Sequence, residues 1–188
     1  LNLGIQEATG DYIVCLSGHC IPVNDQWLES LVNTLEESKN YAGVYGRQEP
    51  MSFSSDSDKR DLLLTFGLDK RIQIKDSFFH NANSIIRKEF LDEVPFDDDI
   101  TNIEDRIWAQ EMIERGYNIV YEPDASVYHY HGIHQDGDRL RCTNIVKIIE
   151  SFVGDKFSSG SISPEKIRIN ALIPVKGKPI YLGGIPQI

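Results

Sequence analysis

The sequence predicts an α/β protein built around a parallel sheet, because helical and extended patterns alternate over its first 45 residues. Apolar residues repeat at helical spacing over 1–9 and again over 27–35, and short apolar runs follow at 12–16 and 41–45. Helices that alternate with strands are typical of parallel α/β sheets. The chain has 188 residues, 40% of them hydrophobic and 26% charged, which suits one soluble domain with a real core.

The first two predicted elements are a helix and a buried strand. Residues 1–9 place Leu1, Ile5 and Ala8 on one helical face, and Gly10 stands where such a helix ends. The five apolar residues 12–16 predict a strand buried on both faces, with Pro22 stopping its pairing.

The next helix and strand complete the repeated pattern. Asn24 or Asp25 is the expected N-cap of the helix over 27–35, and Gly46 closes the strand over 41–45. Further along, the patterns predict four helices, over 61–66, 88–94, 103–115 (with Gly116 at its end) and 144–152. They also predict a loop over 48–59, a loop leading into a strand over 80–87, and strands over 117–121 and 126–131 with a turn at Pro123 between them.

Charge and composition exclude several classes of protein. The formal net charge of -10 argues against a general nucleic-acid binder, and no apolar run is long enough to span a membrane. No signal-peptide pattern is visible, and the odd cysteine count, Cys15, Cys20 and Cys142, lacks zinc-ribbon spacing. We therefore expect reduced thiols in a cytoplasmic protein. The start at Leu1, in mid-pattern, suggests a piece of a longer protein.

The carboxyl end of the strand over 12–16 is the first candidate site. Ser17, Gly18, His19 and Cys20 follow this strand directly. Ligands of open α/β sheets bind just outside the carboxyl ends of strands, so this small, polar loop is placed for chemistry. Ser17 lacks the surrounding glycines of a hydrolase nucleophile elbow.

Two further groups of residues have both a functional and a structural interpretation. Glu104 and Asp105 open the helix over 103–115, where carboxylates either cap the helix or act as a general base at a pocket edge. His129 and His131 share a face if extended, and they either bind Mn, Zn or Fe or belong to a polar surface hairpin.

Asn81 and Asn83 lie on a loop next to aromatic residues. They either bind sugar hydroxyls or hydrogen-bond the turn.

Four blocks in order resemble family 2 glycosyltransferases of the GT-A fold over roughly residues 1–135. The blocks are Asn2-x-Gly4-Ile5-x-x-Ala8-x-Gly10-Asp11-Tyr12-Ile13, Leu16-Ser-Gly-His-Cys-Ile-Pro22 with Trp27-Leu28, Phe79-His-Asn-Ala-Asn83 with Ile86-Arg87 ahead of Pro95-Phe96-Asp97, and Ile103-Glu104-Asp105 with Gly116-Tyr117, Tyr121-Glu122-Pro123 and Val127-Tyr128-His129. The resemblance implies a partial GT-A fold over 1–153, with a mixed sheet flanked by helices and without the N-terminal nucleotide-binding strands. A linker and tail would follow over 154–188.

The resemblance also implies an inverting sugar transfer from a nucleotide sugar to a glycan or lipid-linked acceptor. Asp105 would deprotonate the acceptor hydroxyl and Glu104 would orient it. A divalent cation, Mn or Mg, would neutralise the leaving diphosphate. The expected metal ligands are His19, His129 and, as runner-up, His131, and the expected substrate contacts are Ser17, Gly18, Asn81, Asn83, Arg106 and Trp108.

The second block departs from the family pattern, because Ser17 and His19 stand where the family has the two aspartates of its metal motif. Mg and Mn prefer oxygen donors, so the loss of both carboxylates weakens such a site. Either a metal binds His19 and His129, or diphosphate binds without a tightly held metal.

Two other functions and several partners follow from these features. The alternatives are a non-catalytic GT-A-like module that binds glycan or a partner, and a metal hydrolase that uses His129, His131 and Asp105. We expect this chain alone to bind a sugar nucleotide poorly, and any membrane association to be peripheral, through the acceptor. Residues 170–178 resemble the first strand and loop of sugar-nucleotide cytidylyltransferases, or form an apolar strand in a tail.

Overall fold

The structure is a computed structural model that describes residues 1–100, 102–133, 139–153, 172–175 and 178–181. It divides into two compact units, residues 1–146 and 147–188. The first unit holds the main sheet and its flanking helices. Among the described residues, no helix combines the length and apolar character needed to cross a membrane.

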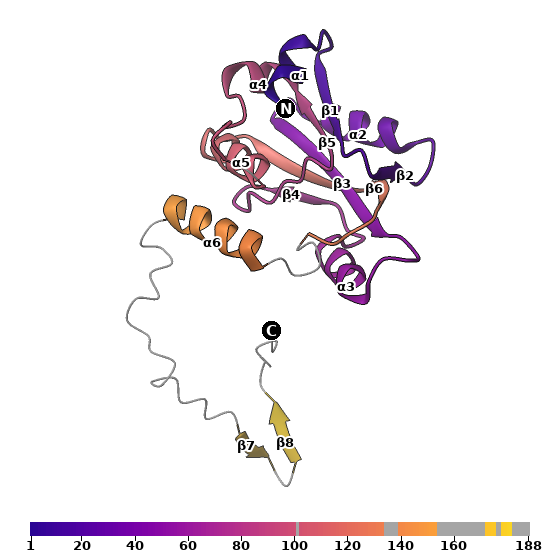
Figure 1. The fold of residues 1–188 in the computed structure, drawn as a ribbon, viewed down its shortest axis with the longest axis vertical. Helices are drawn as coiled ribbons and strands as arrows, with labels where there is room; N and C mark the ends of the chain where they lie inside the picture. The colour runs from indigo at the N-terminus through magenta and orange to yellow at the C-terminus, as the bar shows by residue number, and fades with distance from the viewer. Residues whose placement is uncertain (101, 134–138, 154–171, 176–177, 182–188) are drawn as a thin grey trace. The chain divides into compact units, whose positions relative to one another are not determined.

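The first unit is organised around a six-stranded mixed sheet in the described part of the chain (Figure 1). Its strands are β1 (Tyr12–Leu16), β2 (Cys20–Pro22), β3 (Tyr41–Pro50), β4 (Arg71–Gln73), β5 (Asn83–Arg87) and β6 (Asn118–His129). The strand order is β1-β5-β3-β6-β2, and β4 also pairs with β6. β3 runs parallel to β6, whereas β5 is antiparallel to both β1 and β3.

The mixed sheet confirms the fold class implied by the resemblance and corrects the purely parallel sheet expected from the alternation alone. The alternating pattern ended at residue 45, before the segments that form β4 (Arg71–Gln73) and β5. β4 is antiparallel to β6, and β5 lies between β1 and β3 and is antiparallel to both.

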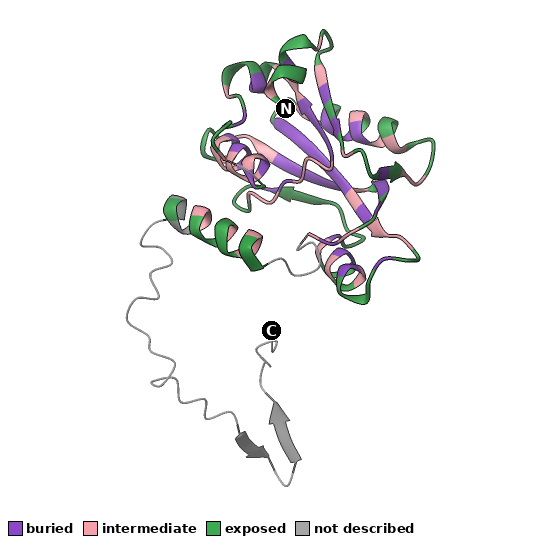
Figure 2. Cartoon of the chain, viewed as in Figure 1, coloured by how far each residue is buried: buried purple, intermediate pink, exposed green. Residues whose placement is uncertain are grey.

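Helices cover both faces of this sheet, which places buried residues mainly on the central strands (Figure 2). On one face, α2 (Trp27–Glu36) packs Leu31 and Leu35 against Val44 of β3 and Ile85 of β5. The opposite face is covered by α1 (Asn2–Glu7), α3 (Asp56–Thr65), α4 (Lys88–Glu93) and α5 (Glu104–Glu114).

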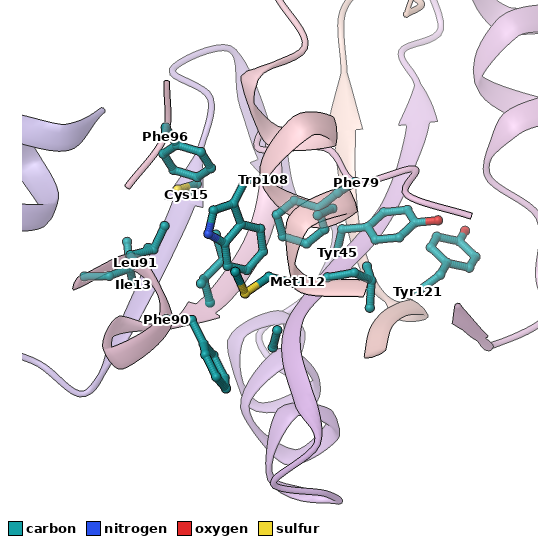
Figure 3. Close-up of a cluster of buried hydrophobic side chains, with 14 of the residues drawn as sticks. Ile13, Cys15, Tyr45, Phe79, Phe90, Leu91, Phe96, Trp108, Met112 and Tyr121 are labelled. Carbon is teal, nitrogen blue, oxygen red and sulfur yellow. The ribbon is translucent and has the colours of Figure 1, made fainter. Parts of the chain in front are cut away.

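An aromatic cluster fills the second face, and Figure 3 shows its members pointing toward one another. The Trp108 ring of α5 lies with its centroid 5.6 Å from that of Phe79, and the rings of Tyr45 and Tyr121 are 5.0 Å apart. Aromatic pairs at such separations contribute about 0.5–1.5 kcal/mol beyond the area that they bury. This packing fixes the start of α5 against the sheet.

Strand β1 has the predicted bounds but not the predicted burial. Val14 and Leu16 are each 40% exposed, because their face of the strand lies beyond the cover of α2 and, within the described residues, β1 pairs only with β5. The prediction of a strand buried on both faces was wrong. Pro22 does not stop the pairing either, since it ends the short strand β2 opposite Val127.

Several predicted boundaries shift because strand pairing continues through residues that often end strands. β3 extends to Pro50 rather than closing at Gly46, so the loop predicted from residue 48 was wrong at its start. β6 continues through Pro123, where two shorter strands were predicted. β4 was not predicted, and the helices α3 and α6 (Arg139–Val153) begin earlier than expected.

Helix ends were predicted more accurately at the glycine stop than at the caps. Gly116 adopts φ 92° directly after α5, as its position predicted. The N-cap of α2 is Gln26, and Asn24 instead accepts a hydrogen bond from the Gln26 amide at 3.0 Å. α1 and α4 occupy the stretches predicted for them.

The second unit contains a two-stranded antiparallel sheet of β7 (Leu172–Val175) and β8 (Lys178–Tyr181). β7 falls within the stretch that resembles cytidylyltransferases, a resemblance that remains a prediction. The predicted linker, residues 154–164, lies outside the described residues.

Candidate functional site

A cleft of about 890 Å³ opens in the first unit beside the end of β1. Segments far apart in sequence line it: α1, β1, the loop over 78–82, the start of α5, the end of β6 and the first half of α6. Its lining includes polar side chains from most of these segments, namely Ser17, His19, His80, Asn81, Glu104, Asp105, Arg106, His129, His131 and Arg141.

Asp105 is a buried carboxylate of this cleft, and it is held by two backbone amides. It is only 8% exposed, and its oxygens accept hydrogen bonds from the Asn81 amide at 2.9 Å and from the Arg106 amide at 2.8 Å. Burial raises the pKa of the Asp105 carboxyl to about 6, and these two hydrogen bonds oppose that rise. A base with such a pKa is mostly ionised at neutral pH and accepts protons more readily than an ordinary aspartate.

The structure is compatible with both interpretations of Asp105, as a helix cap and as a general base at a pocket edge. One carboxylate oxygen bonds an amide in the first turn of α5, while the other reaches across to the loop that carries Asn81. Glu104 precedes it on the cleft lining, with its Oε2 atom buried and without a hydrogen bond in the described structure. The Arg106 guanidinium lies 4.8 Å from the Phe78 ring centroid, which holds a positive charge at the same wall.

His19 and His129, which the resemblance paired as expected metal ligands, lie in one cluster with His131. The Nε2 atoms of His19 and His129 are 2.9 Å apart, although the residues are 110 positions apart in sequence. The ring centroid of His131 lies 4.8 Å from that of His19 and 4.5 Å from that of His129. His80 adds a fourth ring 6.5 Å from His129.

Strand pairing explains how these histidines meet. β2 pairs antiparallel with the end of β6 and sets Cys20 opposite His129, so the loop residue His19 falls beside the His129 ring. Downstream, the Gly132 amide donates to the Asp58 carboxylate of α3 at 2.5 Å. This contact ties the chain after His131 to α3.

The surroundings of His19, His80 and His129 favour the uncharged form of each imidazole. Burial lowers the pKa of His129 to about 3, and the nearby His131, His80 and His19 lower it further. Burial likewise lowers the pKa of His80 to about 4, with Arg141 and Arg106 adding to the effect, and burial and His131 lower the pKa of His19. Neutral imidazole is the form that binds metal ions.

The donor set in this cluster suits a cation that accepts nitrogen and sulfur. The ligand atoms of His19, Cys20 and His129 all lie within 4.8 Å of one another, and among the described residues no carboxylate joins that group. Ser17 stands 3.1 Å from His19 Nδ1, where its hydroxyl orients the imidazole. Mg²⁺ prefers oxygen ligands and fits poorly, whereas imidazole suits several transition metals.

Two of the predicted substrate contacts, Asn83 and Trp108, are buried outside the cleft lining. Asn83 is fully buried: it accepts a hydrogen bond from Trp27 Nε1 at 2.8 Å and donates to the Ala125 carbonyl at 2.8 Å. Trp108 is 3% exposed and belongs to the aromatic core (Figure 3). Neither residue lines the cleft, and Gly18 is exposed beside it.

His80 is the residue that the motif reasoning missed. It lines the cleft and accepts a hydrogen bond from the Ala82 amide at 3.3 Å. Its position directly before Asn81, within a block already singled out, was the signal that could have found it.

A family model matches residues 1–95, which is 95 of the chain's 188 residues, and its description is glycosyl transferase family 2. The chain belongs to this family. A relative within the curated proteins is the O-antigen chain rhamnosyltransferase WbaN of Salmonella anatum, 28% identical over 131 residues. That match covers 64% of this chain and 41% of the relative, so the chain spans about two fifths of the relative's length.

Solved glycosyltransferase structures share the fold of this family 2 chain. The mannosyltransferase PcManGT from Pyrobaculum calidifontis, in complex with GDP-Man and Mn²⁺, superposes with a TM-score of 0.55 at 16% identity, over 80% of this chain and 42% of its own. GalNAc-T7 with UDP, GalNAc and Mn²⁺ gives 0.54 at 16% identity, over 79% and 33%. These likenesses show the GT-A fold.

Proposed function

We propose that this chain carries the acceptor and diphosphate side of an inverting glycosyltransferase. The observation that carries the proposal is a buried carboxylate, Asp105, in the same cleft as the His19 and His129 pair. A base for the acceptor and a cation site for the leaving group are the two functions that such a transfer needs. Membership of glycosyl transferase family 2 supports the reaction class.

In the proposed reaction, Asp105 takes the proton from an acceptor hydroxyl. That oxygen forms a bond to the anomeric carbon of the donor sugar from the face opposite the diphosphate. The bond between the anomeric carbon and the diphosphate oxygen breaks, so the nucleoside diphosphate leaves with the electron pair and the configuration inverts. Glu104, adjacent on the cleft lining, orients the acceptor hydroxyl toward Asp105.

The diphosphate would lie toward the histidines. His19 and His129 would hold a divalent cation there, and this ion, when bound, supplies Lewis-acid stabilisation of the departing charge. The guanidinium of Arg106 adds a fixed positive charge on the same cleft. The solved structures of PcManGT, with GDP-Man and Mn²⁺, and of GalNAc-T7, with UDP and Mn²⁺, support a nucleotide-sugar donor and a divalent ion.

The acceptor in this proposal is a growing glycan, carried on a lipid. The rhamnosyltransferase relative, which is described as acting in O-antigen chains, supports a glycan acceptor. We place the reaction in the cytoplasm, because all three cysteines are free thiols and reducing compartments keep thiols in that state. Any membrane contact would then be peripheral and made through the acceptor.

The test is sugar transfer by the chain within the longest natural protein that contains it. Asp105→Asn should lower kcat by about 100-fold or more, because general base catalysis contributes on that scale. Asp25→Asn, at an exposed position away from the cleft, is the matched control and should keep full activity. Unchanged turnover in Asp105→Asn, or glycan binding without any transfer, would overturn the proposal.

A further inference from the structure

We propose that His19, Cys20 and His129 form a zinc site, with the Cys20 thiolate as a ligand, that selects Zn²⁺ over Mg²⁺ and Mn²⁺. The inference concerns which ion the cluster holds. It stands on the geometry of the three side chains and is testable whether or not the protein transfers sugar.

The sheet pairing builds this site. Cys20 and His129 are directly opposite each other in the antiparallel pair of β2 and β6. Opposite residues in such a pair have Cβ atoms about 4.5–5.5 Å apart and project from the same face. Both are buried, and the Cys20 amide donates to the Ser17 carbonyl at 2.9 Å, which fixes the loop that carries His19.

The distances are close to those of a coordinated ion. Zn–N bonds of about 2.0–2.1 Å and Zn–S bonds of about 2.3 Å in a tetrahedron set the ligand atoms about 3.3–3.8 Å apart. The two imidazole nitrogens are already 2.9 Å apart, and the three ligand atoms lie within 4.8 Å of one another. A movement of about 1 Å by these side chains therefore completes three bonds to zinc.

The donor types decide which ion binds. Two imidazole nitrogens and a thiolate are ligands of Zn²⁺, whereas Mg²⁺ takes oxygen ligands in octahedral geometry. In the affinity order of the divalent first-row metals, which peaks at Cu²⁺, Zn²⁺ also binds such sites more tightly than Mn²⁺. On binding, the Cys20 thiol loses its proton to solvent and its sulfur donates an electron pair to the ion.

His131 is placed to occupy the fourth position. Its Nδ1 lies 3.0 Å from the Gly132 carbonyl oxygen, so Nδ1–H donates there and Nε2 carries the lone pair. A histidine whose second nitrogen is fixed in this way is the usual form of a metal ligand. Its ring centroid is 4.5 Å from that of His129, beside the three grouped ligands, and either Nε2 of His131 or a diphosphate oxygen would complete the coordination.

The first experiment titrates the metal-free, reduced 188-residue chain with Zn²⁺ and with Mn²⁺ against a chromophoric chelator. We expect one Zn²⁺ per chain, bound at least about 100-fold more tightly than Mn²⁺, as the order of metal affinities predicts. Cys20→Ser should weaken Zn²⁺ binding by about 10-fold or more and change Mn²⁺ binding little. Cys142→Ser, which alters a cleft cysteine outside the cluster, is the control and should bind Zn²⁺ like the parent chain.

A second measurement needs no variant, so it remains decisive if Cys20→Ser fails to fold. Co²⁺ in place of Zn²⁺ should give a thiolate-to-cobalt charge-transfer band in the unmodified chain, and Zn²⁺ should slow alkylation of Cys20 without slowing that of Cys142. Tighter binding of Mn²⁺ than of Zn²⁺, or a Co²⁺ complex without the thiolate band, would overturn the zinc site. These metal-binding experiments use no donor sugar. A negative result would therefore overturn the zinc site alone, whereas the transfer assay of Asp105→Asn tests the proposed glycosyltransferase function.

Discussion

Asp105 shows how one residue type acquires its chemistry from its surroundings. Nothing in a Glu-Asp pair at a helix start distinguishes a cap from a base, and the sequence left both interpretations open. The distinction arises because the loop carrying Asn81 closes over the carboxylate, which leaves it 8% exposed with two amide donors. That closure joins residues 24 positions apart, so local pattern could not reveal the raised pKa.

The pH dependence of transfer should follow the Asp105 carboxyl. Its pKa in the folded chain is about 6, so kcat/KM should rise with pH through about 6 and level off above about 7, as the carboxylate becomes the base form. A pH profile of kcat/KM measures this directly. A profile that stays level between pH 5 and 7 would contradict the assignment of Asp105 as the base.

The same carboxyl should also make stability depend on pH, but in the opposite direction: stability should fall as pH rises, whereas kcat/KM should rise. Its folded pKa of about 6 exceeds the ordinary value of 3.8, so between these values the folded state binds the extra proton and its stability falls as pH rises. The full loss in the free energy of unfolding, reached above pH 6, is about 3 kcal/mol. Relative to the parent chain, Asp105→Asn should therefore gain melting temperature as pH rises from 4 to 7, whereas Asp25→Asn should show no such trend.

At the scale of elements, the site depends on a close approach of β3 to β6. Gly46 lies within β3 where the register with β6 shifts, and Asn83 of β5 bonds the carbonyls of Arg47 and Ala125 there. Beyond this junction, β3 continues alongside the end of β6, with Pro50 opposite His129. The junction thus supports the strand end that carries the histidine.

This junction also marks where sequence patterns stop being informative. A glycine after five strand residues indicated a strand end, yet Gly46 is there because the neighbouring backbone leaves no room for a side chain. Asn81 and Asn83 looked equivalent in sequence, but only Asn81 lines the cleft, since Asn83 fills the buried junction. Their difference is set by Ala125, some 40 residues later, through the hydrogen bond with Asn83.

Gly46→Ala should be strongly destabilising. An added Cβ would overlap the Ala125 carbonyl oxygen and crowd the Asn83 amide, and backbone atoms cannot move aside as a flexible side chain can. We expect a loss of about 3 kcal/mol or more in the free energy of unfolding, at or above the upper end of overpacking effects. Gly67→Ala, where a Cβ meets no heavy atom within 4 Å, is the control and should change stability by less than about 0.5 kcal/mol in denaturant unfolding. Equal stability of the two variants would refute this account of the junction.

At the scale of the whole molecule, alternating helices and strands indicated the α/β class, and the ordered motifs indicated a mixed sheet. The three-residue strands β2 and β4 escaped prediction, because such short pairings have no measurable periodicity and are formed by contact with β6. The pairing of β2 is also what joins His19 to His129, so the cluster could be expected only through the family resemblance.

The first unit should fold and bind metal without the tail. Both hydrophobic clusters and the whole lining of the cleft lie within residues 1–146. A chain ending at Val153, the last residue of α6, should therefore have a thermal unfolding midpoint within about 2 °C of that of the 188-residue chain. A loss of about 1 kcal/mol in the free energy of unfolding would already shift the midpoint of a domain this size by 2–4 °C or more. Calorimetry of both chains, with and without Zn²⁺, makes the comparison, and Zn²⁺ should raise both midpoints equally. A markedly lower midpoint in the shorter chain would mean that residues 154–188 stabilise the first unit, and that the cores of the sheet are not sufficient by themselves.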